Sequence, residues 1–218
     1  MTAALLGIGL SSAFVAGLLV LRAAHPHART VPVLTLACFV VVGAVSLTQL
    51  AAFPRLLGLL MRDSYGGVVR EPWRLVTSLL VQDGGWAGTF FNLLGLLAVG
   101  SVAELLFGRW RWGLVGFISF SAAQAVALAW QPVGAGNSML NFGLAGAICV
   151  LTSFGPSAQR SSVPGVVGLL CISGLLLIRD IHGAAGAAGA LTAVVLLLHD
   201  SGIGPAGQPS NERIERTP

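Results

Sequence analysis

Long uncharged apolar runs, separated by short polar or Pro/Gly-containing breaks, make up most of the chain. A helix needs about 20 such residues to cross the hydrocarbon core of a bilayer. One long uncharged stretch is divided at QPVGAG (131–136), because proline and glycine are typical of turns. The pattern therefore predicts an all-α, polytopic membrane helix bundle with seven spans, at roughly 3–21, 32–53, 86–106, 112–130, 138–154, 164–178 and 182–199.

The composition supports a membrane protein. Hydrophobic residues make up 55% of the chain and charged residues only 9%, with a mean hydropathy of +0.85, whereas a soluble domain carries about 25% charged residues. The chain has arginine but no lysine, and no basic run lies beside aromatic residues, so a nucleic-acid partner is not expected. The cysteines lie singly inside apolar runs without metal-ligand spacing, and no metal, disulfide or cofactor is expected.

Arginine positions predict the orientation, because cytoplasmic loops carry more basic residues than external ones. Arginines follow the first, third, fifth and seventh spans, at Arg22, Arg29, Arg109, Arg111, Arg160, Arg213 and Arg216. The N-terminus is then outside. The connection 54–82 breaks the pattern, but it is long enough to be structured and to lie at the outer face of the membrane. The predicted organisation is an extra N-terminal helix and loop (1–31), a membrane domain (32–199) and a disordered cytoplasmic tail (200–218).

A serine and a histidine at the outer ends of two predicted spans are the candidate reactive groups. Ser138, in GNSMLNFG, begins the fifth span and His182 begins the seventh, so both side chains are expected at similar depth. Polar ionisable groups inside a membrane are functional candidates by default. A neutral imidazole can take the proton of a serine hydroxyl and make it a nucleophile. Without lysine or an H-E-x-x-H pair, this is the one catalytic pair that the chain permits.

The surrounding small residues allow a second interpretation. The run HGAAGAAGA, from His182 to Ala190, lets another helix approach its backbone closely. Taken separately, this run is typical of helix packing, and Ser138 of a serine that bonds to a neighbouring helix. Asp180 is not expected to act on His182, because positions i and i+2 do not face each other on a helix; pairing with Arg179 or water is its expected role. The shared depth of Ser138 and His182 favours the catalytic interpretation.

These residues resemble the rhomboid family of intramembrane serine proteases over roughly residues 32–199. The family signatures are matched by W-R (Trp73, Arg74), G-x-x-x-E-x-x-x-G (Gly100, Glu104, Gly108), G-x-S (Gly136, Ser138), an aromatic four residues after the serine (Phe142), and H-x-x-G-x-x-x-G with alanine at its middle glycine (His182, Ala185, Gly189). The resemblance implies a six-helix rhomboid core preceded by one extra N-terminal transmembrane helix.

The same resemblance implies a protease that cleaves transmembrane segments of membrane proteins. Ser138 would be the nucleophile and His182 its base, with Phe142 stacked on the imidazole ring. Asn92 and the backbone N–H of Ser138 would stabilise the oxyanion. The span 164–178 would move to admit substrate from the bilayer, and the expected partners are transmembrane substrates and lipid.

Three positions depart from the family pattern. Gly88 and Asp83 stand where family members have histidines, and Met139 follows the serine where glycine is frequent. Losing one oxyanion donor costs about 10²–10³ in rate, so a weakened protease is expected. The alternative, favoured by Gly88 and Asp83, is a catalytically inactive rhomboid-like protein that binds transmembrane clients. A small transporter is disfavoured because the sequence has no duplicated half.

The composition also bears on location. The arginine-only, Ala-, Gly- and Val-rich sequence indicates a GC-rich bacterial genome. The expected location is therefore the inner membrane of a bacterium.

Overall fold

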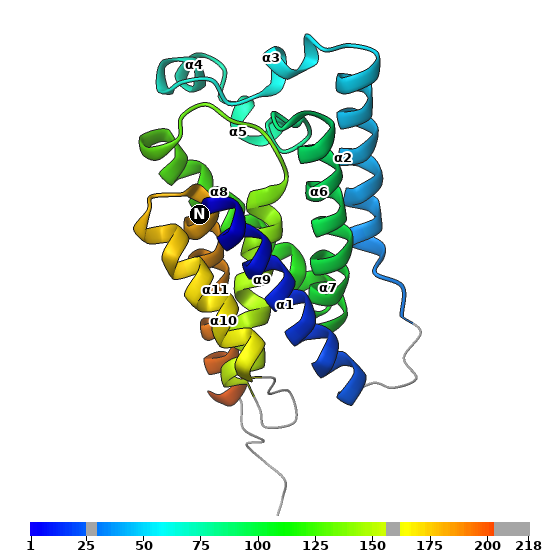
Figure 1. Cartoon of the computed structure of the whole chain (residues 1–218), viewed down its shortest axis with the longest axis vertical. Helices are drawn as coiled ribbons and strands as arrows, with labels where there is room; N and C mark the ends of the chain where they lie inside the picture. Colours follow the sequence, from blue (N-terminus) through cyan, green and yellow to red (C-terminus); the bar gives the residue numbers. More distant parts are fainter. Residues whose placement is uncertain (25–29, 156–161, 203–218) are drawn as a thin grey trace, which may run out of the picture.

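The computed structural model describes residues 1–24, 30–155 and 162–202, and shows a bundle of helices (Figure 1). Five helical segments are long and apolar enough to cross a membrane, and two shorter apolar helices bring the set to seven. They are α1 (Thr2–Ala24), α2 (Val33–Ala51), the continuous α6 (Gly85–Gly95), η1 (Leu96–Gly100) and α7 (Ser101–Phe107), α8 (Arg109–Trp130), α9 (Ser138–Phe154), α10 (Ser162–Leu177) and α11 (Ile181–Gly202). The predicted all-α bundle is confirmed.

Two details differ from the sequence prediction. The third span contains η1, a π-helical stretch, which hydropathy cannot reveal because the apolar run continues through it. The last helix extends to Gly202 and so includes the first residues of the predicted tail. The rest of that tail, residues 203–218, lies outside the described residues.

Three of the arginines that predicted the orientation lie at one end of the bundle, whereas the four arginines of the 54–82 connection lie at the opposite end. Arg22 is in the last turn of α1, and Arg109 and Arg111 begin α8, at the end opposite to α3, α4 and α5 (Figure 1). Arg111 pairs with Asp200 near the end of α11 at 2.7 Å. The shared end of Arg22, Arg109 and Arg111 agrees with the predicted orientation of the helices. That this end is the cytoplasmic one stays a prediction. The other arginines used for it, Arg29, Arg160, Arg213 and Arg216, lie outside the described residues.

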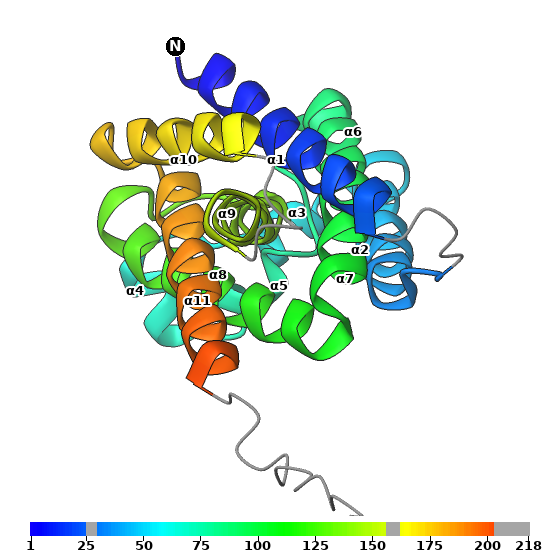
Figure 2. The same ribbon diagram turned by 90° about the horizontal axis from the view of Figure 1, so that it is seen from below.

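Helix α9 lies at the centre of the bundle, in contact with α1, α8, α10 and α11 (Figure 2). Every residue from Met139 to Thr152 is buried. A helix that is buried all round is apolar on every face and is fixed by its neighbours. Ser138, the first residue of this helix, therefore stands on a tightly constrained element.

Helices α9 and α11 cross in close backbone contact because glycines meet at their interface. A Cβ atom added to Gly146 would overlap the carbonyl oxygen of Gly186, and one added to Gly189 would overlap the carbonyl oxygen of Gly143. Small residues allow such an approach between membrane helices. The contact sets the N-terminal ends of the two helices side by side.

The connection between α2 and α6 is structured at one end of the bundle (Figure 1). Its short helices are α3 (Leu56–Leu60), α4 (Tyr65–Arg70) and α5 (Arg74–Thr77). Arg74 ties the segment together, because it donates to the carbonyl oxygens of Gly58 at 2.8 Å and Met61 at 3.1 Å and pairs with Glu71. Its neighbour Trp73 is exposed. The contribution of the Trp-Arg motif to this connection therefore comes from Arg74.

Glu104, on α7, caps the N-terminus of α2. Its carboxylate oxygens accept the backbone N–H groups of Leu34 at 3.0 Å and Thr35 at 2.7 Å. The first N–H groups of a helix have no partner within the helix, and α2 follows Pro32 without a side-chain cap of its own. Glu104 therefore joins α2 to α7 and has a structural role in the fold.

Helix α1 is packed into the bundle along α9 and α10 (Figure 2). A Cβ atom at Gly9 would stand 3.3 Å from Cys171 of α10 and 3.6 Å from the ring of Phe142 on α9. Gly17, two turns further on, faces Val102 of α7. The extra N-terminal helix thus covers one face of α10 and packs against α9, the helix that carries Ser138.

Candidate active site

The N-terminal ends of α9 and α11 bring Ser138 and His182 together. The Oγ of Ser138 lies 2.8 Å from Nε2 of His182, which is a hydrogen-bond distance. Each side chain belongs to the first turn of its helix. This is the contact that the sequence predicted from their equal depth.

The turn before Ser138 requires a glycine. Gly136 has a φ of +136°, a conformation that residues with a side chain rarely adopt. Its N–H donates to the carbonyl oxygen of Ser78 at 2.8 Å. A Cβ atom at this position would stand 3.0 Å from Oε1 of Gln82 and 3.1 Å from Nδ2 of Asn92. Gly136 therefore lets both amides approach the start of α9.

Asn92, on α6, is held by a network of amides. Its Nδ2 donates to Oε1 of Gln82 at 2.7 Å, and a primary amide has a second hydrogen to give. Its backbone oxygen accepts from Asn137 at 3.0 Å and from Asn141 at 2.9 Å. Gln82 is buried and donates to Asn137 at 2.9 Å. The sequence analysis missed Gln82, because a single glutamine in a connection carries no spacing signal.

Backbone and side-chain donors converge beside Ser138. The first N–H groups of α9 have no helical partner, and the helix dipole favours negative charge there. The N–H of Ser138 and the amide of Asn92 can together stabilise an oxyanion. At Gly88, where the family has a histidine, no atom lies within 4 Å of an added Cβ. Asp83, at the second such position, accepts the N–H of Ala135 at 2.9 Å and so fixes the segment before α9.

Asp180 contacts His182, so the sequence interpretation of Asp180 was wrong. Its Oδ1 lies 2.6 Å from Nδ1 of His182 and also accepts the backbone N–H of His182 at 2.9 Å. The argument from i and i+2 fails because Asp180 is outside the helix, which begins at Ile181. Arg179, with a φ of 57°, turns the chain just before it. A residue that precedes the first turn can fold its side chain back onto that turn.

Phe142 meets the imidazole ring of His182 edge-on. The ring centroids are 5.1 Å apart and the planes form an angle of 63°, which differs from the stacked arrangement that the resemblance implied. Edge-to-face pairs are among the favoured aromatic geometries. Phe142 is buried and packs with Ile181 and Ala185 of α11, so it supports the imidazole ring from α9.

A cavity of about 420 Å³ opens onto this pair. Its lining includes Ser138, His182, Asn92, Asp83 and the fully buried Arg62. Among the described residues, no three His, Cys, Asp or Glu side chains gather in a way that could hold a metal ion. The groups that converge here are those of nucleophilic and acid–base chemistry.

The remaining residues that the motifs singled out lie away from this cavity. Arg74 stabilises the connection before α6, where the side chain of Trp73 is exposed, and Glu104 caps α2. Gly189 acts through the backbone contact between α9 and α11. These residues support the site through the fold.

The sequence matches the family model of the Rhomboid domain over residues 69–201. No curated protein matches the chain. The matched region begins in α4 and ends in α11, and it includes both members of the Ser–His pair, Asn92 and Glu104. The chain belongs to the rhomboid family.

Proposed function

We propose that this protein is an intramembrane serine endopeptidase that cleaves transmembrane segments of other membrane proteins. The observation that carries the proposal is the 2.8 Å contact between the Ser138 hydroxyl and the His182 imidazole at the edge of a cavity. The family is one of multi-pass membrane proteins that are generally intramembrane serine proteases.

The chemistry follows from the positions of the donors and acceptors. Ser138 Oγ attacks the carbonyl carbon of the substrate peptide bond while its proton passes to Nε2 of His182. The N–H of Ser138 and the amide of Asn92 stabilise the negative charge that develops on the carbonyl oxygen. His182 then gives the proton to the leaving amine, and water attacks the acyl-enzyme with His182 again as base.

The open space at Gly88 is expected to reduce the activity, because one oxyanion donor of the family is missing there. Removing one preorganised oxyanion donor lowers the rate by about 10²–10³ and leaves most of the catalytic acceleration. Asn92 and the helix N-terminus are still available to the oxyanion. Gly88 also favours the second candidate function, a rhomboid-like protein that binds transmembrane clients without cleaving them.

A labelling experiment separates the two functions. The protein, purified in detergent, is treated with a fluorophosphonate and, separately, with a model transmembrane substrate. We expect covalent labelling and cleavage, both lost in Ser138→Ala, with Ser153→Ala as the matched control because Ser153 lies near the other end of α9. Well-folded protein that is neither labelled nor active would contradict the protease and favour the client-binding protein.

The proposed setting follows from the same features. Transmembrane proteins and the lipid bilayer are the proposed partners, because Ser138 and His182 lie within a bundle that contains five membrane-length helices among the described residues. We propose the inner membrane of a bacterium as its location, on the basis of the arginine-only, Ala- and Gly-rich composition.

A further inference from the structure

Asp180 extends the Ser–His pair to a chain of three hydrogen-bonded side chains. We propose that Asp180 positions His182 and selects its tautomer, so that the reaction depends on a Ser138–His182–Asp180 arrangement rather than on a dyad. The inference rests on the proposed protease function and adds a positioning residue to it. It is carried by two contacts, from Nε2 of His182 to Ser138 at 2.8 Å and from Nδ1 to Asp180 at 2.6 Å.

The tautomer follows from the donor and acceptor types. A carboxylate can only accept hydrogen bonds, so the contact of Asp180 with Nδ1 requires a hydrogen on Nδ1. A neutral imidazole with hydrogen on Nδ1 has its lone pair on Nε2, and Nε2 faces the hydroxyl of Ser138. This is the form that can take the serine proton. Without Asp180 the opposite tautomer competes, and in that form Nε2 cannot act as a base.

Asp180 is ionised in its surroundings. Burial acts to raise the pKa of its carboxyl, but the interactions of Asp180 with His182, led by the hydrogen bond to the ring, outweigh burial and hold that pKa below its usual value. The carboxylate therefore stabilises the imidazolium that forms when Ser138 gives up its proton. It keeps its negative charge throughout, and the proton stays on His182 until the leaving amine takes it.

Helix capping alone does not account for this geometry. Oδ1 of Asp180 accepts the backbone N–H of His182 at 2.9 Å, which is an ordinary capping bond at the start of α11. An asparagine, serine or threonine would serve equally well for that purpose. The additional contact with the ring nitrogen orients the imidazole, and a cap does not need it.

The test compares Asp180→Asn with Asp180→Glu in the full-length protein. Asparagine can keep the cap through Oδ1 but removes the negative charge that favours hydrogen on Nδ1 and stabilises the imidazolium. We expect kcat for Asp180→Asn to fall on the order of 10²–10⁴-fold, with KM and the melting temperature unchanged. Asp180→Glu keeps a carboxylate and should recover part of the rate. In a His182→Ala background, Asp180→Asn should cause no further loss, because Asp180 acts through His182.

Three results would overturn the proposal. They are an unchanged kcat in Asp180→Asn, a loss that follows the melting temperature, or an equal loss in the Asn and Glu variants with no rescue. Each of these is compatible with Ser138-dependent activity in the parent protein. An inactive parent protein, in contrast, would contradict the proposed function itself.

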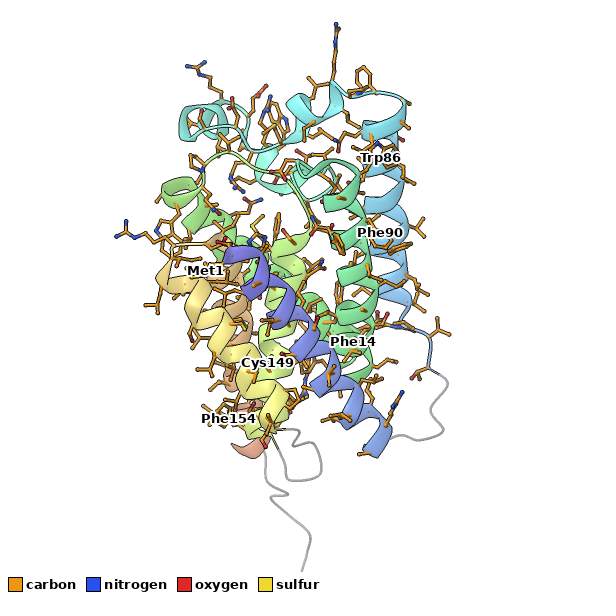
Figure 3. All side chains as sticks on the ribbon, viewed as in Figure 1. Met1, Phe14, Trp86, Phe90, Cys149 and Phe154 are labelled. Atoms are coloured by element: carbon orange, nitrogen blue, oxygen red, sulfur yellow. The ribbon has the colours of Figure 1, made fainter. Side chains whose placement is uncertain are left out.

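A second observation, independent of Asp180, concerns the space beside α1. A groove of about 560 Å³ lies between α1 and the α6–η1 segment. Its lining is mostly apolar and includes Leu6, Leu10, Phe14, Phe91, Leu94 and Val99; Phe14 is labelled in Figure 3. The groove adjoins the catalytic cavity, since Leu6 and Asn92 line both.

The other side of α1 is closed. Gly9 brings α1 against Cys171 of α10 and Phe142 of α9, so α1 covers the helix that was expected to move for lateral entry. We infer that an apolar segment of a transmembrane substrate reaches Ser138 along the groove between α1 and α6, with α1 as one wall of its binding site. This inference also rests on the proposed function, and it assigns α1 a role in substrate selection.

Filling the groove tests this inference. At Gly7, which lines the groove, no atom lies within 4 Å of an added Cβ, so Gly7→Phe has room for its Cβ and extends a ring into the groove. Ile8→Phe is the matched control, because Ile8 is exposed and does not line the groove. We expect Gly7→Phe to lower kcat/KM for a transmembrane substrate about tenfold or more, with fluorophosphonate labelling unchanged. Ile8→Phe should leave both unchanged.

Two outcomes would contradict a substrate groove. Equal cleavage by Gly7→Phe and the parent protein would exclude a substrate groove. Normal cleavage by Gly7→Phe together with a loss of spin-labelled lipid binding would also exclude it and would assign the groove to lipid. Retained labelling in every variant shows that the reactive serine is intact. The result therefore bears on the groove and not on the proposed chemistry.

Discussion

Replacing His182 with alanine should lower kcat for cleavage of a transmembrane substrate on the order of 10⁵-fold. Among the described residues, the imidazole of His182 is the group that contacts the Ser138 hydroxyl, and without a base the hydroxyl is a poor nucleophile at neutral pH. Residues that act as one unit are strongly non-additive. The double variant Ser138→Ala, His182→Ala should therefore be no slower than either single variant. Single-turnover cleavage in detergent measures all three.

His199→Ala is the control for this experiment. His199 is an exposed histidine near the other end of the same helix, and its removal should leave the rate within about twofold of the parent protein. An additive loss in the double variant would show that Ser138 and His182 act separately, and the proposed mechanism would then be wrong.

Gly189→Ala should destabilise the protein and lower its activity together. The new Cβ atom would overlap the carbonyl oxygen of Gly143, and neither backbone can yield without separating α9 from α11. Overpacking of a tight interface typically costs about 1–3 kcal/mol. The same separation moves His182 away from Ser138, so we expect kcat to fall at least about tenfold. Thermal unfolding in detergent and the cleavage rate give the two readouts.

The matched control is Gly113→Ala in α8. No atom lies within 4 Å of a Cβ atom placed at Gly113, and alanine is favoured over glycine in a helix by about 1 kcal/mol. This substitution should therefore be neutral or slightly stabilising. A Gly189→Ala protein as stable and as active as Gly113→Ala would show that the backbone contact of α9 with α11 is unimportant.

The fold and the meeting of Ser138 with His182 were predictable, because span length, apolar composition and the position of a residue within a span can be read directly from the sequence. A span must be long and apolar, so the seven helices follow from the uncharged runs. Ser138 and His182 begin their spans from the same side, and the small residues after His182 permit close contact. The motif around Ser138 also indicated that Gly136 is required, and its φ of +136° gives the reason.

Other parts of the site depend on where helices begin and end. Asp180 was rejected on helix periodicity, but it lies one residue before α11 and reaches back to His182. Gln82 bonds to Asn92, although no spacing pattern in the sequence predicts this contact. A one-residue change in a helix boundary decides such contacts, and hydropathy does not define a boundary that closely.

The sequence by itself determined that this protein is a membrane-spanning helical bundle with a serine and a histidine at one depth, because burial in lipid restricts which residues a span can hold. Only the tertiary structure decided which groups meet around that pair: the carboxylate of Asp180 on the imidazole, the amide network on Asn92, and α1 against α10. These contacts join residues from different elements, and their geometry depends on how glycine-lined helices pack, which no local pattern specifies.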